Sequence, residues 1–439
     1  MRLTSTLLIF CAAAAGAQQP PIRQLGAIAA KSTVTWNNII GLRALPGGRV
    51  LVNDVVGRKI VLLDSSLAQL SVVADTTAAT ATAYSGRIAS IIPYRADSTL
   101  FVDPQSMSMM VIDPNGKMTS RVMALPRSED AGALGGLQGS GSALDARGRL
   151  VYRAPFRFTR SGPPPTDGKL PMMPTPPESA MIVRVDLATR QLDTVGIIKI
   201  PKMNVQVSQD DKGNMRMSMQ MNPLPVVDDW AVLSDGSVAF VRGRDYHVDF
   251  VNADGSKTSA AKIPFDWQRL TDEDKAAFID SVKAARARLA TGALGAPTPA
   301  GAPAGRATGG PPPDGGGRVV IQMGPDGGGT RNNSASFNPQ SQIDFVSPSE
   351  LPDYKPPFFA NSVRADASGN IWVRTIPTRQ IPGGAVYDVI NHDGKLIDRV
   401  QVPVGRTIVG FGADGSVYLV TRDTSGAMPT MTLERAPLR

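Results

Sequence analysis

The fold is decided by one stretch of sequence, which reads Asp366-Ala367-Ser368-Gly369 and then Ile371-Trp372-Val373-Arg374. The first half is typical of a tight turn that closes on Gly, and the second half is an apolar strand that ends in a charged residue. A third strand, residues 387–390, and a second turn, Asn391-His392-Asp393-Gly394, follow it. Such a unit cannot bury both of its faces alone, so further copies are expected along the chain.

Six copies are present, and each has a turn residue just before its apolar strand. The successive turn residues are 49, 51, 88, 133 and 46 positions apart. The interval of 88 residues contains two unusual segments, 161–177 and 202–226, and the interval of 133 residues contains one, 266–355. Without these segments the two intervals shorten to 46 and 43 residues. A period of 43 to 51 residues is typical of a four-stranded propeller blade. The turn residues are Gly48, Asp97, Gly148, Gly236, Gly369 and Gly415.

The repeat predicts an all-β, six-bladed β-propeller. The last copy shows only three strands before the chain ends, so one strand must come from elsewhere to close the ring. We expect residues 22–28, ahead of the first copy, to supply it. The expected blades span about 38–75, 86–126, 139–200, 228–265, 359–403 and 405–438 with 22–28.

The sequence pattern of the copies resembles that of a known group of proteins. A Gly turn is followed by an apolar strand ending in Asp or Arg, and the third strand often ends in Asp, as at Asp64, Asp113 and Asp186. This pattern resembles six-bladed β-propellers of the NHL-like and TolB-like kind. The resemblance implies a fold far more than an activity.

The N-terminus reads as an export signal. Arg2 supplies the positive start, residues 7–14 the apolar stretch, and Ala15-Gly16-Ala17 a small-residue cleavage site. We expect residues 1–17 to be removed and the mature protein to be periplasmic or extracellular; the alternative is a buried N-terminal helix. Phe10 before Cys11 does not suit a lipid anchor, and loss of Cys11 with the signal leaves no thiol for disulfides.

Composition narrows the classes of partner. The chain has 46 Lys and Arg against 38 Asp and Glu, a formal net charge of +8, which favours anionic ligands or surfaces. Its basic residues are scattered and are not interleaved with aromatic ones, so a nucleic-acid partner is not expected. No apolar run after residue 17 is long enough to span a membrane.

The three inserts are expected on one face, because links from second to third strands and from blade to blade open on the same side of a propeller. Residues 161–177 predict a polyproline-like flap. Residues 202–226 predict a hairpin with a Met/Val face, which could pack or bind Cu(I). Residues 266–355 begin with a helix capped by Thr271, with Phe278, Ile279, Val282, Ala285 and Leu289 at helical spacing, and continue with a disordered Gly/Pro-rich loop.

The candidate ligand-binding residues face the same side. Four blades carry an Arg near the end of the second strand, and a ring of guanidinium groups suits a carboxylate, phosphate or acidic sugar. The alternative is that these arginines pair with neighbouring carboxylates or point to solvent. Residues that open the first strands would line the same mouth, and Trp230 could stack on a ring. The candidates are Arg153, Arg242, Arg374 and Arg422 at second strands, and Asn38, Arg87, Asp229, Trp230, Asn361 and Arg406 at first strands.

Enzymatic chemistry has less support. Only His247 and His392 are present; His392 lies in a turn, and His247 could act as an acid or base at the mouth. Lactonases and amidating lyases that resemble this fold use a central Ca or Zn, but their His set and early Glu are missing from the matching places. No cofactor and no metal site are predicted, although calcium could be held by Asn53, Asp54, Asp103 and Asn361.

These observations favour an exported, soluble propeller that acts as a binding or scaffold protein. Its expected partner is a small anionic ligand or another exported protein. The alternative function is that of a metal-dependent hydrolase or lyase of the lactonase-like kind. An enzyme is the less favoured class.

Overall fold

The computed structural model describes residues 19–77, 84–86, 88–136, 141–155, 176–209, 215–290, 343–379, 381–426 and 429–438. In this part of the chain, six sheets are each built on four antiparallel strands that follow one another in sequence, apart from one strand of the last sheet. We number these sheets as blades one to six. Blade one contains β3 (Ile39–Ala44), β4 (Val50–Asp54), β5 (Lys59–Leu63) and β6 (Gln69–Ala74). Blade two contains β7 (Ser90–Pro93), β8 (Thr99–Asp103), β9 (Ser108–Ile112) and β10 (Met118–Ala124), and blade three β11 (Ala143–Leu144), β12 (Leu150–Arg153), β13 (Ser179–Val185) and β14 (Leu192–Lys199).

The second half of the ring repeats the pattern. Blade four contains β17 (Asp229–Val232), β18 (Val238–Arg242), β19 (His247–Val251) and β20 (Lys257–Ser259). Blade five contains β22 (Phe358–Ala365), β23 (Ile371–Thr375), β24 (Val386–Ile390) and β25 (Leu396–Gln401). Blade six contains β26 (Arg406–Phe411), β27 (Ser416–Asp423), β28 (Thr430–Pro437) and the early strand β2 (Ala30–Lys31). Short helical turns lie at η1 (Pro46–Gly48), η3 (Arg95–Asp97), η4 (Ser128–Asp130), α1 (Ala131–Leu134) and η5 (Pro348–Glu350).

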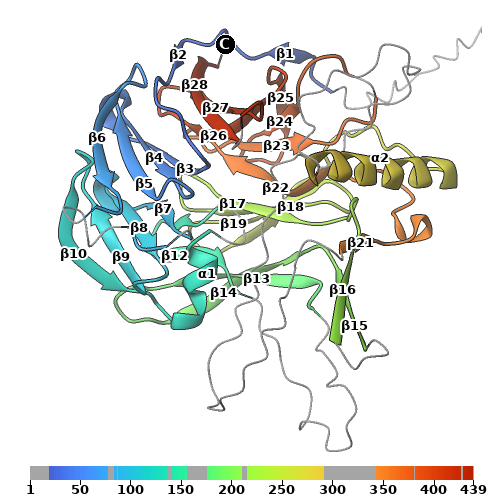
Figure 1. The fold of residues 1–439 in the computed structure, drawn as a ribbon, viewed down its shortest axis with the longest axis horizontal. Coiled ribbons are helices and arrows are strands. Elements are labelled where there is room, and N and C mark those ends of the chain that lie inside the picture. Colours follow the sequence, from blue (N-terminus) through green and yellow to red (C-terminus); the bar gives the residue numbers. More distant parts are fainter. Residues whose placement is uncertain are drawn as a thin grey trace, which may run out of the picture.

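The blades form a closed ring, because each one packs on the next through its own apolar cluster. Among the described residues, six clusters each join two neighbouring blades. One of them joins the last blade to the first, with Val50 and Leu63 against Tyr418 and Leu433. First strands of neighbouring blades also contact one another, so they surround the centre, and β6 and β10 lie at the rim (Figure 1). The prediction of a six-bladed propeller is confirmed.

The six turn residues taken from the sequence share one backbone conformation. Each has a positive φ, between 58° at Asp97 and 83° at Gly369. This region favours Gly, and Asp is among the residues that tolerate it best. The repeat in the sequence is therefore a repeat of this turn between first and second strands.

The N-terminal segment closes the ring, but not with the expected residues. Ala30 and Lys31 of β2 pair antiparallel with Arg435 and Glu434 of β28, whereas β1 (Ile22–Gln24) pairs parallel with β25 of blade five. The expectation that residues 22–28 complete blade six was wrong. Trp36 explains the shift: its fully buried ring sits in the cluster between blades six and one, and it pairs with Met431.

The inserts lie at links between second and third strands or between blades, as expected. The predicted hairpin is confirmed as β15 (Met203–Gln209) and β16 (Met215–Met221), with β21 (Ile343–Phe345) added parallel to β16. The predicted helix is α2 (Asp272–Ala290), in which the Asp274 N–H donates to Thr271 Oγ1 at 3.1 Å. Phe278, Ile279 and Val282 are buried as expected, but Ala285 is exposed. The flap residues 161–175 and the loop 292–329 lie outside the described residues.

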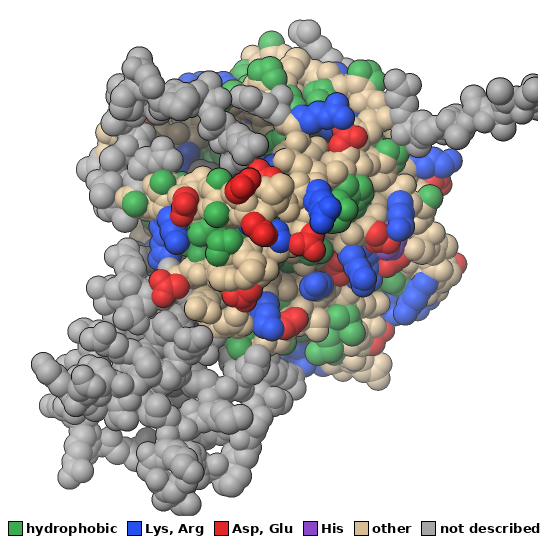
Figure 2. All heavy atoms as spheres, turned by 90° about the vertical axis from the view of Figure 1, so that its right-hand side faces the viewer, with side chains coloured by type: hydrophobic (Ala, Val, Ile, Leu, Met, Phe, Trp, Pro, Cys, Tyr) green, Lys and Arg blue, Asp and Glu red, His purple; other side chains and the backbone are tan. Residues whose placement is uncertain are grey.

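The positive charge of the chain is not gathered on the side of the molecule seen in Figure 2. There, Lys and Arg side chains alternate with Asp and Glu.

Within the described ranges, no helix has the length and apolar character needed to cross a bilayer.

Candidate functional site

The four arginines of the expected ring do lie in second strands. Arg153 ends β12, Arg242 ends β18, and Arg374 and Arg422 lie near the ends of β23 and β27. The second strands stand one strand away from the centre, however, because the first strands occupy it. What each guanidinium does is therefore decided by its local contacts.

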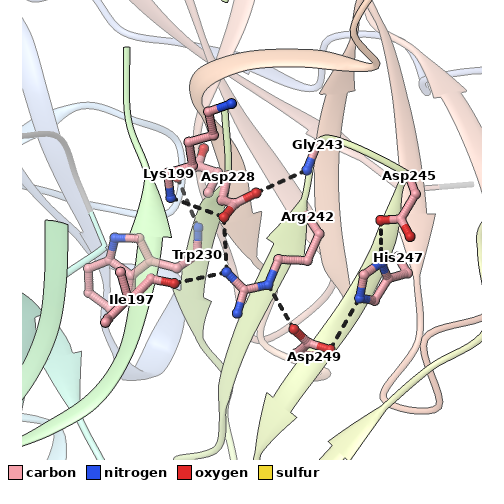
Figure 3. A network of polar contacts seen from close by, with 10 residues as sticks. Ile197, Lys199, Asp228, Trp230, Arg242, Gly243, Asp245, His247 and Asp249 are labelled. Carbon is pink, nitrogen blue, oxygen red and sulfur yellow. Dashed lines mark hydrogen bonds and ion pairs between the residues drawn. The ribbon is translucent and has the colours of Figure 1, made fainter. Parts of the chain in front are cut away.

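Arg242 is held by two carboxylates between blades three and four (Figure 3). Its Nε donates to Asp249 Oδ2 at 2.7 Å, and its Nη1 donates to Asp228 Oδ2 at 2.9 Å and to the Ile197 carbonyl at 2.8 Å. Burial lowers the pKa of Arg242, but the hydrogen bonds from Arg242 to Asp249 and Asp228 outweigh it, and the pKa is raised. Arg242 is therefore a structural link between blades, as the alternative interpretation of the arginines predicted.

His247 continues the same network away from the centre. Its Nδ1 lies 2.7 Å from Asp245 Oδ1 and its Nε2 lies 3.2 Å from Asp249 Oδ1 (Figure 3). Lys262 Nζ lies 3.6 Å from the other oxygen of Asp245. These contacts use both ring nitrogens, so His247 belongs to a charge network of blade four rather than to the mouth of the channel.

The guanidinium group of Arg406 also finds its hydrogen-bond partner within its own blade. Its Nε donates to Glu434 Oε2 at 2.5 Å and its Nη2 donates to Oε1 at 3.3 Å, and Glu434 is only 4% exposed. This two-pronged pairing occupies the guanidinium face that an anion would use. Arg374 is partly buried, Arg422 is exposed, and Arg87 lies outside the described residues.

Two further candidates have structural roles. Trp230 is 6% exposed and lies in the cluster between blades three and four, so it is not available to stack on a ligand, contrary to expectation. The backbone N–H of Asn38 donates to Asp54 Oδ1 at 3.0 Å, and the carbonyl of Asn38 accepts the N–H of Val55.

Asn361 is exposed with a φ of 62°, at an irregularity in the pairing of β22 with β23.

Asp229 lies at the centre of the ring. It opens β17 and is 6% exposed. Its Oδ1 accepts the Trp230 N–H at 2.9 Å, and its Oδ2 accepts the Val363 N–H of blade five at 3.0 Å. Burial raises the pKa of Asp229 to about 6, although these hydrogen bonds and the positive charge of Arg364 oppose the shift. Asp229 is therefore a carboxyl group that changes charge near neutral pH.

Two guanidinium groups interact electrostatically with Asp229. Arg153 comes from blade three and Arg364 from β22 of blade five, and both side chains are partly buried. Burial lowers the pKa of each arginine, whereas the negative charge of Asp229 raises it. Arginine stays protonated under ordinary conditions. We call Arg153, Asp229 and Arg364 the channel cluster; its net charge is +1 with Asp229 ionised and +2 with Asp229 neutral.

The chemistry of the channel cluster suits an oxyanion. A guanidinium group presents a planar fork of donors that matches a carboxylate or a phosphate. Such hydrogen bonds are stronger in partly buried surroundings than in water, because the dielectric screening is weaker. Of the residues predicted from the sequence, Arg153 and Asp229 interact electrostatically, and Asn361 lies three residues before Arg364 in the chain.

Arg364 was missed by sequence reasoning. We expected Asn361 to begin the first strand of blade five, whereas this strand begins at Phe358 and its pairing with β23 is irregular between Phe358 and Val363. One signal was available: Arg364 is the one charged residue of the first strand Phe358–Ala365, two positions before Asp366, which begins the turn. Charged side chains at such positions are rarely buried unless they have a partner.

Three of the four residues considered for calcium have hydrogen-bond partners within the protein. Asp54 accepts the backbone N–H groups of Asn37, Asn38 and Gly57, and Asn53 Oδ1 accepts the hydroxyl of Tyr84 at 2.6 Å. Asp103 accepts the Ser85 hydroxyl and the Gln105 N–H. Within the ranges that the structure describes, no three His, Cys, Asp or Glu side chains are grouped as metal ligands.

The opposite face carries a polar pocket of about 370 Å³ between blades four and five, and Asp235 and His392 help to line it. His392 Nε2 lies 3.1 Å from Asp235 Oδ2, and its ring stacks on Phe250 at 5.2 Å. Asp235 Oδ2 also accepts the Ser237 hydroxyl at 2.8 Å. These contacts tie the turns of two blades together, and His392 is a turn residue as expected.

No protein-family model matches the sequence, and no curated protein is significantly similar to it. Solved structures with a similar fold include a gluconolactonase from Xanthomonas campestris, with 11% identity and a TM-score of 0.38 over 95% of this chain and 97% of that one. A streptogramin B lyase has 11% identity and a TM-score of 0.36 over 92% and 96% of the two chains. A calcium-binding regucalcin from Agrobacterium tumefaciens has 12% identity and a TM-score of 0.34 over 95% and 98%. Because these TM-scores lie below 0.5, we draw no conclusion about the site from them.

Proposed function

We propose that the protein is an exported binding protein that holds a small oxyanion, a carboxylate or a phosphate, at the channel cluster. One observation carries the proposal: Arg153 and Arg364 come from different blades to the same buried carboxyl group, Asp229. A guanidinium group presents a planar fork of donors that matches a carboxylate or a phosphate, which supports an oxyanion as the ligand.

Export to the periplasm or beyond is part of the proposal and rests on the N-terminal sequence, as does the closer likeness to NHL-like and TolB-like propellers. The six-bladed ring also hosts metal-dependent hydrolases and lyases, which is the alternative function. The contacts of Asn53, Asp54 and Asp103 with backbone and hydroxyl donors favour binding over that alternative. Metal analysis of the purified protein checks this point, and a stoichiometric calcium or zinc ion would favour the enzyme.

The binding proposal predicts a measurable affinity for simple oxyanions. Isothermal titration calorimetry with acetate, succinate, phosphate and methanesulfonate should show one site per chain. Arg153→Ala or Arg364→Ala should weaken the affinity at least tenfold, because each removes a charge-assisted pair of hydrogen bonds.

Arg147→Ala is the matched control, since Arg147 is an exposed arginine in a turn on the opposite face. Its affinity should equal that of the wild-type protein. The proposal fails if none of the four anions binds, or if Arg147→Ala weakens binding as much as Arg153→Ala does. Circular dichroism of each variant shows whether the fold is kept.

A further inference from the structure

The polar pocket between blades four and five is built from residues outside the channel cluster. Its volume of about 370 Å³ is within the range typical of small-ligand sites, roughly 300 to 1,000 Å³. Three turns form it, one from blade four and two from blade five. We call it the interblade pocket; residues 234–235, 368–370 and 391–393 line it.

Two neighbouring turns stand apart at this pocket. Gly236 of blade four and Gly369 of blade five hold the same position in their turns, with φ of 82° and 83°. A Cβ at Gly236 would lie 2.0 Å from the backbone nitrogen of Ala146, so the turns of blades three and four touch through their backbones. A Cβ at Gly369 would meet Ser234 Oγ at 3.0 Å and no atom of another described residue within 4 Å. Blades four and five therefore leave a gap where blades three and four are in contact.

The interblade pocket offers both hydrogen-bond donors and acceptors. Its side chains are two carboxylates, two carboxamides, two hydroxyl groups and one imidazole, and none of the described residues that line it is Lys, Arg or a large apolar residue. An anion would meet two carboxylates without a cation, and a cation could not use the N–H groups of the carboxamides and the imidazole. A ligand hydroxyl group both donates and accepts, so a neutral polyhydroxyl molecule suits this lining best.

Two of these side chains are fixed by contacts within the protein. His392 Nε2 lies 3.1 Å from Asp235 Oδ2, and the His392 ring stacks on Phe250 at 5.2 Å. Because Nε2 faces a carboxylate oxygen, the neutral imidazole carries its proton there, and Nδ1 is left as an acceptor. Asp235 accepts the Ser237 N–H at 2.9 Å and the Ser237 hydroxyl at 2.8 Å. Side chains held in this way lose little conformational entropy when a ligand binds.

Other groups of the lining keep bonding capacity for a ligand. Within the described part of the chain, the hydroxyl groups of Ser234 and Ser368 form no hydrogen bond with another residue. The Asp393 carboxylate has one long contact, with Asn391 Nδ2 at 3.4 Å. A ligand hydroxyl group that donates to this carboxylate would form a charge-assisted hydrogen bond, about twice as strong as one between neutral groups.

We propose that the interblade pocket binds a neutral monosaccharide. Its hydroxyl groups donate to Asp393 and exchange hydrogen bonds with the hydroxyl groups of Ser234 and Ser368. This site is separate from the oxyanion site of the proposed function and does not depend on it. The protein then has a second ligand site, on the face opposite to the inserts.

The histidines provide a direct test, because the chain has only two and His392 lines the pocket whereas His247 does not. The imidazole NMR signals of wild-type protein without a histidine tag are followed while glucose, galactose, mannose or N-acetylglucosamine is added. His247→Gln and His392→Gln assign the two signals. We expect at least one sugar to shift the His392 signal in a saturable way and to leave the His247 signal unchanged.

Two tryptophan variants test whether the pocket itself is the site. Ser368→Trp should abolish the response to the sugar, because the indole ring takes up the space between the turns. Arg147→Trp is the matched control and should keep the response. Arg147 holds the same turn position in blade three, and its N–H donates to Asp145 Oδ1 at 3.0 Å, as the Ser368 N–H donates to Asp366 Oδ1 at 2.9 Å.

Two alanine variants test the carboxylate. Asp393→Ala should weaken the affinity for the sugar about tenfold, because it removes a charge-assisted hydrogen bond. Asp254→Ala is its matched control and should bind as the wild type does. Asp254 holds the same position in the turn between the third and fourth strands of blade four, and it does not line the pocket.

The proposal is overturned if none of the four sugars shifts the His392 signal of the wild type, or if Ser368→Trp and Asp393→Ala both bind as tightly as the wild type. A response to spermidine with none to the sugars also overturns it, since the pocket would then be a cation site. The wild-type titration decides the matter even if Ser368→Trp does not fold. None of these outcomes involves Arg153 or Arg364, so the proposed function is tested separately.

Discussion

The arginines of this molecule differ in the carboxyl groups beside them. Arg242 bonds to Asp228 and Asp249, and Arg406 bonds to both oxygens of Glu434. Arg153 and Arg364 share an electrostatic partner, Asp229. Arg242 links blades three and four and Arg406 is paired within blade six, whereas Arg153 and Arg364 are the arginines on which the binding proposal depends.

Asp229 should also make the stability of the fold depend on pH. Its pKa is raised to about 6 in the folded protein, so between about pH 4 and pH 6 the folded chain binds a proton that the unfolded chain has lost. Stability must therefore fall as pH rises through this window, by about 3 kcal/mol from this group alone. Urea unfolding at pH 4 and pH 7 should show this loss in the wild type but not in Asp229→Asn; parallel changes in both proteins would contradict it.

Removing Arg242 should destabilise the fold, because Asp228 and Asp249 would be left without their guanidinium partner. Arg242→Ala should lower the free energy of unfolding by about 2 kcal/mol, measured by chemical denaturation. Arg147→Ala, at an exposed turn, should change it by less than about 0.5 kcal/mol. Anion affinity should be unchanged in Arg242→Ala, which separates the structural arginines from the channel cluster.

Among the elements, the turn between first and second strands is the repeated unit, but its glycines do not have equal surroundings. Gly236 and Gly415 hold the same position in blades four and six, with φ of 82° and 77°. A Cβ at Gly236 would lie 2.0 Å from the backbone nitrogen of Ala146 in blade three. A Cβ at Gly415 would meet nothing within 4 Å. The turn of blade four is therefore also a contact between blades.

This pair gives a matched prediction. Gly415→Ala should cost about 1 kcal/mol, from the strain of a positive φ alone. Gly236→Ala adds a backbone clash and should cost at least about 3 kcal/mol. Thermal unfolding of the two variants compares them directly, and equal losses would show that the two turns are equivalent.

The six turns and the hairpin β15–β16 were predictable, because Gly spacing and alternation depend on local backbone geometry. The closing strand was misplaced by several residues, since Trp36 fixes it through a contact with Met431 at the far end of the chain. Arg364 and Trp230 were misjudged for the same kind of reason: an irregularity in β22 and a cluster between blades are products of tertiary packing.

For the whole molecule, ring closure by β2 is the feature that joins the two ends of the chain. The Ala29 N–H donates to the Arg435 carbonyl at 2.7 Å, and the Ser32 N–H donates to that of Leu433 at 2.8 Å. Ala29→Pro removes one of these donors and should lower stability by about 1 to 3 kcal/mol. Ala29→Gly keeps the donor and is the control. Unchanged thermal unfolding of Ala29→Pro would mean that the closure contributes little to stability.

The site depends on the same ring, since blades three, four and five each contribute one residue to the channel cluster. The most direct measurement is an anomalous-difference map from crystals of the wild-type protein soaked in bromide. We predict a bromide ion within hydrogen-bonding distance of both the Arg153 and Arg364 guanidinium groups, and its loss in crystals of Arg153→Ala. Bromide found elsewhere on the surface, with nothing between these two arginines, would contradict the account.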